Sequence, residues 1–164
     1  MDKRIKSIIN KYEKVYNGAP WYGDSITKIL KNVNPGIVFN KVDKKSHSIA
    51  ELVAHMIGWR DIVFNQINGN KKDRITQKET FNWKRFDKNE KTAWESLLIE
   101  LNKNQMKYIS FLAKKDDEFL NAKIPGKSRN AEYLIEGIIQ HDVYHLGQMA
   151  LLNKILKPKI TLPY

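Results

Sequence analysis

The sequence contains no cysteine. This absence excludes disulfide bonds, thiolate metal ligands and a cysteine nucleophile. No apolar run approaches the roughly 18 residues that a membrane-spanning helix needs, and residues 1–7 lack the apolar stretch of a signal peptide. From these absences we expect a cytoplasmic protein that does not enter a membrane and whose fold depends on its hydrophobic core.

Motifs that bind nucleotides or carry a serine nucleophile are also missing. The eight glycines form neither a phosphate-binding loop nor a dinucleotide-binding fingerprint. No serine lies in a Gly-x-Ser-x-Gly elbow. What is present is the composition of a globular protein, with 41% hydrophobic and 29% charged residues, so the chain can bury a core. A length of 164 residues predicts a single domain over residues 1–164.

The net charge is strongly positive. The 29 lysines and arginines against 18 acidic residues give a formal charge of +11, a balance that can mark proteins that bind nucleic acids or anionic membranes. The excess is mostly lysine, spread in pairs along the whole chain among many asparagines and isoleucines. A compositionally biased genome also produces this combination, and we favour that interpretation over a dedicated binding face.

Hydrophobic periodicity predicts helices and no strand. Residues 2–17 carry one apolar stripe at helical spacing, and Gly18 and Pro20 end that helix. Similar patterns predict one short helix around residues 25–33 and three further long helices, in residues 48–68, 89–115 and 130–156. Residues 71–88 show neither period and are expected to form a long ordered connection. The predicted fold class is therefore all-α, an antiparallel four-helix bundle with a long crossover connection between the second and third main helices.

Two of the predicted helices have distinctive ends and faces. The second long helix begins at Ser48, whose side chain can form a capping box with that of Glu51. Asn130 is a suitable N-cap for the last helix, which Pro158 ends. The inward face of this last helix is predicted to contain Leu134, Ile138, His141, His145, Gln148, Leu152 and Ile155. Two histidines are therefore expected in the interior of the bundle.

These two histidines indicate a metal site. His141 and His145 are four residues apart, so both imidazoles project from one helix face and can chelate a single ion. His55, in the middle of the second long helix, is the expected third ligand. Three histidines would leave a fourth coordination position open, as in a reactive rather than a structural site. From spacing alone, the alternative is a set of hydrogen-bonded core histidines.

Two polar residues could support the predicted ligands. Glu51 lies one turn before His55, and Gln148 lies three residues after His145, so either could accept a ring N–H and fix the tautomer. The remaining histidine, His47, precedes a helix N-cap and is expected to serve the loop.

Asp142 is a third candidate for the surroundings of the site. It follows His141 directly and gives the sequence His-Asp-x-x-His, which is similar to the His-Glu-x-x-His helix of zinc proteases. In those enzymes the acid is the general base. An aspartate is one methylene shorter and reaches less far toward a metal-bound water, which argues against a protease.

Three stretches of the sequence match a known family pattern. They are residues 18–25 (GAPWYGDS), 47–59 (HSIAELVAHMIGW) and 137–148 (GIIQHDVYHLGQ). With them the chain resembles the DinB-like superfamily, in particular its small bacterial members, in the right order and nearly end to end. The resemblance implies a four-helix bundle with a long crossover and a divalent metal held by three histidines. Those positions fall on His55, His141 and His145.

The resemblance implies a class of function rather than one reaction. The metal in such proteins is typically zinc or nickel, and some members use iron or manganese. Characterised relatives include thiol-dependent S-transferases and isomerases, and proteins described as metal-dependent hydrolases. We therefore expect a transferase or hydrolase that acts on a small molecule such as a low-molecular-weight thiol. For hydrolysis, Asp142 or Glu51 could serve as the base, and the sequence assigns no catalytic residue. A homodimer is compatible with the resemblance.

Two other functions compete with this expectation. Residues 71–91 contain basic and aromatic side chains that could contact phosphates and stack bases, as in a non-enzymatic module for nucleic acid or another polyanion. Interspersed acidic residues dilute this charge, so we favour a solvated crossover whose aromatic side chains pack on the bundle. The metal site could also be structural or vestigial, and metal removal would then lower the melting temperature without abolishing a reaction.

Overall fold

The computed structural model describes residues 2–69, 83–86 and 91–157. Within these residues all regular structure is helical, apart from one isolated bridge between Lys123 and Asn130. The elements in chain order are α1 (Lys3–Tyr16), α2 (Ile26–Lys31), the 3-10 helix η1 (Pro35–Ile37), α3 (Ile49–Ile67), α4 (Lys91–Leu112), α5 (Asp117–Asn121) and α6 (Ala131–Leu156). The prediction of an all-α fold is confirmed. None of the helices in the described ranges has the length and apolar character needed to cross a membrane.

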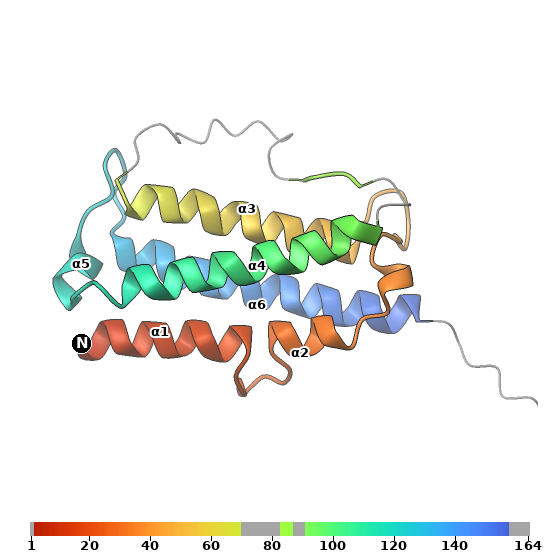
Figure 1. The fold of residues 1–164 in the computed structure, drawn as a ribbon. Helices are drawn as coiled ribbons and strands as arrows, with labels where there is room; N and C mark the ends of the chain where they lie inside the picture. The colour runs from red at the N-terminus through yellow and green to blue at the C-terminus, as the bar shows by residue number, and fades with distance from the viewer. Residues whose placement is uncertain (1, 70–82, 87–90, 158–164) are drawn as a thin grey trace, which may run out of the picture.

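The four long helices lie side by side and form the body of the molecule (Figure 1). α3 packs against α4 and α6, and α1 packs against the same two helices from the other side of the bundle. The short helix α2 continues along the line of α1, while α5 lies at the opposite end beside the start of α6. Burial of the apolar faces between these helices supplies the main stabilisation of the fold.

The two helices that carry the histidines begin where their sequences predict. At the start of α3, Ser48 Oγ accepts a hydrogen bond from the backbone N–H of Glu51 at 3.2 Å, and Glu51 Oε2 accepts one from the backbone N–H of Ser48 at 3.1 Å. At the start of α6, Asn130 Oδ1 accepts a hydrogen bond from the backbone N–H of Tyr133 at 3.0 Å. These caps satisfy amide groups that have no partner within the helix, and they fix where each helix starts.

The connection between α3 and α4 is described only in part. Within it, Trp83 and Phe86 are partly buried and pack against the core, as expected for aromatic side chains of this segment. The ring centroid of Phe86 lies 5.6 Å from that of Phe39, which precedes α3. Phe81 and most of the basic side chains of residues 71–91 lie outside the described residues, so binding of a polyanion by this segment stays a prediction.

The inward face of α6 differs from the prediction. Ile138 and His145 are buried as expected, but Ile155 is 53% exposed, while Asp142 and Met149 lie in the interior. α6 contacts α3 on one side and α1 on another, so its buried surface is wider than one stripe. A stripe chosen by hydrophobicity leaves out an aspartate whose charge is neutralised inside the fold.

Candidate metal centre

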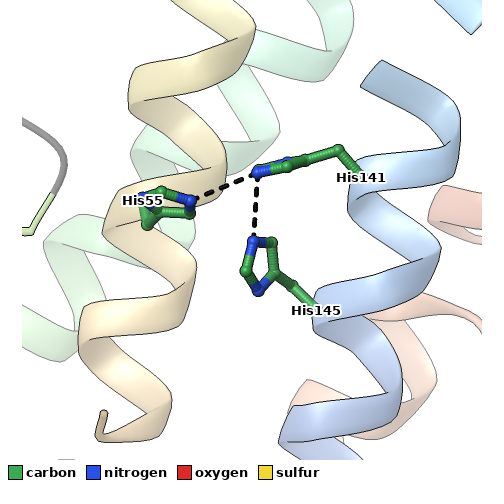
Figure 2. A group of neighbouring side chains, drawn as sticks. All are labelled: His55, His141 and His145. Carbon is green, nitrogen blue, oxygen red and sulfur yellow. Dashed lines mark hydrogen bonds between the residues drawn. The ribbon is translucent and has the colours of Figure 1, made fainter. Parts of the chain in front are cut away.

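Three histidines converge between α3 and α6 (Figure 2). His55 extends from α3, and His141 and His145 extend from successive turns of α6. The Nε2 atom of His141 lies 3.2 Å from that of His55 and 3.0 Å from that of His145. His55 and His145 are buried, and His141 is half-buried. The structure thus brings together the three residues that the sequence predicts as ligands.

Hydrogen bonds cannot account for both Nε2–Nε2 contacts of His141 at once. Gln148 Oε1 lies 2.7 Å from His145 Nδ1, and a carbonyl oxygen only accepts, so Nδ1 carries the proton and Nε2 presents a lone pair to the cluster. If His141 Nε2 carries a proton, it can donate a hydrogen bond to only one of its two neighbours, the Nε2 atom of His55 or that of His145. The buried Nδ1 of His141 has no hydrogen-bond partner within the part of the chain that the structure describes. A group that accepts lone pairs from several Nε2 atoms at once would satisfy both contacts, and it would leave Nδ1 of His141 unchanged.

A divalent cation accepts lone pairs from several imidazole nitrogens at once. Zinc binds imidazole nitrogen at about 2.0–2.1 Å, so two ligands of a tetrahedral site lie about 3.3 Å apart. The Nε2 separations of 3.2 and 3.0 Å are close to that value. Metals bind the neutral imidazole, and burial, together with the charges of His145 and His55, lowers the pKa of His141 to about 3. Burial also lowers the pKa of His145. The cluster could therefore hold one divalent ion.

A buried ion pair joins α3 and α6 next to the histidines. Asp142 Oδ2 accepts hydrogen bonds from Arg60 Nε at 3.0 Å and from Arg60 Nη2 at 2.7 Å, and both side chains are 1% exposed. Gln105 Oε1 accepts a further bond from Arg60 at 3.2 Å, and the Tyr108 hydroxyl donates to the backbone carbonyl of Arg60 at 2.6 Å. Burial alone would lower the pKa of Arg60, but the charge of Asp142 raises it above the usual range. Asp142 is thus engaged by Arg60 and is not among the groups whose ligand atoms converge.

Glu51 has several partners near the start of α3. Besides accepting from the backbone of Ser48, its carboxylate lies 2.8 Å from Lys41 Nζ and 3.5 Å from His47 Nδ1. These contacts tie the loop before α3 to the first turn of the helix. Support of His55 by Glu51 stays a prediction.

A stack of three aromatic rings adjoins the cluster. The Trp83 indole lies between the imidazoles of His47 and His55, with ring centroids 3.4 and 4.1 Å away and planes inclined by 5° and 4°. His47, expected to serve the loop, therefore also contacts a side chain that covers a predicted ligand. Sequence patterns do not predict this role for Trp83, because the connection that carries it has no period. The one signal for this role in the sequence is that Trp83 is an aromatic residue among charged ones.

Comparison with known proteins identifies the family. A family model for the DinB superfamily matches residues 23–149, which is most of the chain and includes the three histidines. The chain belongs to the DinB superfamily. No curated protein matches it.

The fold of this DinB-like protein is similar to that of a solved relative. A DinB-like protein from Bacillus subtilis, YjoA, matches over 99% of this chain and 97% of its own, with a TM-score of 0.62 and 17% sequence identity. At this level of identity the similarity supports the helical DinB-like fold alone.

Proposed function

We propose that this DinB-like protein is a metal-dependent enzyme that activates a thiol or a water molecule at its three-histidine centre. The observation that carries the proposal is the convergence of three imidazoles at separations that suit one ion. Structural zinc sites normally have four protein ligands, whereas three leave one position for a reacting molecule. Within the described residues, the group of converging ligand atoms contains these three histidines and no fourth residue.

The chain's own residues have distinct tasks in this proposal. His55, His141 and His145 would hold the ion, and Gln148 fixes the tautomer and ring orientation of His145 through its contact at 2.7 Å. Trp83 covers one face of the His55 ring and keeps water from it. A divalent ion, when bound, lowers the pKa of a coordinated thiol or water toward neutrality. Thiol-dependent S-transfer and hydrolysis are the two reaction types that this chemistry serves, on a small-molecule substrate such as a low-molecular-weight thiol.

The donor set narrows the identity of the ion. Imidazole nitrogen suits zinc, nickel and iron, while manganese prefers oxygen ligands. Membership of the family adds the preference among these ions, so we expect zinc or nickel first, and iron or manganese after them.

The decisive experiment is the metal content of protein purified without a histidine tag. We expect about one ion per chain in the native protein and a loss of that ion in His55→Ala, His141→Ala and His145→Ala. The matched control is His47→Ala, which removes the fourth histidine of the chain but no residue of the cluster. Unchanged metal content in the three cluster variants would contradict the proposal, as would a loss of metal in the control alone.

Activity assays then separate a catalytic centre from a structural one. Protein loaded with the identified ion would be screened for S-transfer from small thiols and for hydrolysis, next to His141→Ala. A metal-dependent rate that the variant lacks supports the enzyme. A metal that raises the melting temperature but supports no reaction in either screen would favour a structural site.

A further inference from the structure

A small cavity that is open to solvent lies beside His55, between parts of α3, α4 and the segment of residues 83–86. Its volume is about 160 Å³, and an apolar cavity of roughly 150 Å³ can hold a benzene molecule. Its apolar lining comes from Ala54, Ile57, Gly58, Ile62 and Leu97, and polar atoms make up nearly half of its surface. Trp59 also lines it, and the indole of Trp59 lies near the His141 ring at a centroid distance of 5.8 Å. The cavity therefore shares His55 and Trp59 with the surroundings of the metal centre.

Gly58 gives the cavity part of its space. It lies in the middle of α3 with an ordinary helical backbone, since the described glycines with positive φ are Gly23, Gly69 and Gly126. A Cβ atom at position 58 would have no heavy atom within 4 Å. Neither the backbone nor close packing thus requires glycine here, although glycine is among the least favourable residues in a helix interior. The absence of a side chain at Gly58 leaves open space at the cavity wall.

Two opposite charges lie on different walls of this space. Lys84 comes from the segment of residues 83–86 and Glu100 from α4. Both residues are exposed, and Lys84 Nζ lies 5.1 Å from the ring centroid of Phe86. In the described part of the chain, neither forms an ion pair, whereas the third charged residue of the lining, Asp61, is engaged by Lys107 Nζ and Asn104 Nδ2 at 3.0 Å each. Small-molecule sites combine apolar walls with a few polar groups that fix orientation, and this cavity has both.

We propose that this cavity binds a small molecule of amino-acid type. Its compact apolar part would fill the space over Gly58, its carboxylate would pair with Lys84, and its ammonium group would pair with Glu100. As a statement about the substrate, the inference rests on the proposed function, because the shared residues His55 and Trp59 put the bound molecule beside the metal centre. Binding itself needs no metal chemistry and can be measured separately.

The test uses three probes of the same shape that differ in charge. They are L-leucine, 4-methylpentanoate, which lacks the amino group, and 3-methylbutylamine, which lacks the carboxylate. Affinity for the full chain is measured by calorimetry or by NMR shift changes. We expect L-leucine to bind about fivefold more tightly than either analogue, the effect of one partly exposed ion pair.

Variants assign each part of the probe to a residue. Glu100→Gln is expected to reduce the affinity for L-leucine to that for 4-methylpentanoate, and Lys84→Gln to that for 3-methylbutylamine. Gly58→Leu should abolish binding of all three probes, and Gly58→Ala should weaken it. The matched control is Gly137→Ala in α6, where a Cβ also meets nothing within 4 Å but which does not line the cavity. Both alanine variants should raise the melting temperature, and only Gly58→Ala should change binding.

Three results would overturn the inference. They are equal affinity for the three probes, no binding of L-leucine up to its solubility limit, and unchanged binding in Gly58→Ala. If Gly58→Leu does not fold, Gly58→Ala keeps the test valid. Failure here is distinct from failure of the proposed function, because loss of probe binding with intact metal content concerns the cavity alone. Intact probe binding in a protein that takes up no metal would concern the metal centre alone.

Discussion

The same two helices, α3 and α6, bury polar side chains in two neighbouring places. In one place Arg60 forms an ion pair with Asp142. Their opposite charges and the four hydrogen bonds around Arg60 satisfy most of the buried polar atoms there. In the other place three imidazoles meet one another, and their nitrogens converge without enough protons to bond them all. Burial of polar groups costs free energy unless they are paired. The first group is paired within the chain, while the second could hold a cation from outside.

The buried ion pair therefore concerns stability, whereas the histidine cluster concerns function. An ion pair sealed within the core fixes how α3 and α6 pack, and it offers nothing to a ligand. The histidine cluster brings three ring nitrogens together, and burial lowers the pKa of His141 and of His145, which favours the neutral imidazole that a metal binds. Variants on each side of the comparison should therefore affect different measurements.

The largest effect on the free energy of unfolding is expected from a substitution that breaks the Arg60–Asp142 ion pair. Asp142→Ala leaves the Arg60 guanidinium charged and buried, and loss of one partner of a buried pair costs about 3–5 kcal/mol of unfolding free energy. Urea unfolding at pH 7 measures this cost. The double variant Arg60→Met with Asp142→Leu should recover much of the loss, because no unpaired charge remains. A single variant as stable as the native protein would show that the pair does not hold the helices.

Metal removal tests the histidine cluster. A ligand present at about 100 times its dissociation constant stabilises the native state by about 2.7 kcal/mol, so treatment with a chelator should lower the melting temperature, and reloading should restore it. His141→Ala should melt at one temperature with and without added metal, whereas the control His47→Ala should respond like the native protein. If the melting temperature of the native protein does not change with metal, the expected difference between the ion pair and the histidine cluster is contradicted.

Trp83 links the cluster to the connection between α3 and α4, and its loss should have a smaller effect. Trp83→Leu removes the indole that stacks on His55, and we expect metal affinity to fall by about tenfold, as for other groups that orient a ligand. Trp83→Phe should restore part of the affinity. Competition with a chelating indicator measures the change. Trp21, whose side chain is fully exposed, gives the control Trp21→Leu, which should bind metal normally.

The smallest expected effect is the pH dependence of the metal-free protein. The pKa of His141 is about 3 in the fold against an ordinary value of 6.5, so between these values the unfolded chain binds a proton that the folded chain does not. Stability must then rise with pH across this range and be lost on acidification below about 6.5. Denaturant unfolding of metal-free protein at pH 5 and pH 8 tests the sign. In His141→Ala the difference between the two pH values should shrink.

Local signals predicted much of the fold. Ser48 with Glu51 and Asn130 determine where α3 and α6 begin, because each cap needs only residues a few positions away. The spacing of His141 and His145 places two rings on one face of a helix by geometry alone. Ile155 shows the limit of such reasoning, because a hydrophobic residue in a helical stripe can still end beyond the surface that other helices cover.

The sequence by itself determined the helices, their caps and the pair of histidines four residues apart, since these depend on contacts within a turn or two. Only the tertiary structure decided that His55 meets that pair, that Asp142 belongs to Arg60, and that Trp83 lies on the His55 ring. Each of these contacts joins segments far apart in the chain. Their distance in space depends on how whole helices pack, and the packing is set by the summed burial of many side chains rather than by the residues that meet.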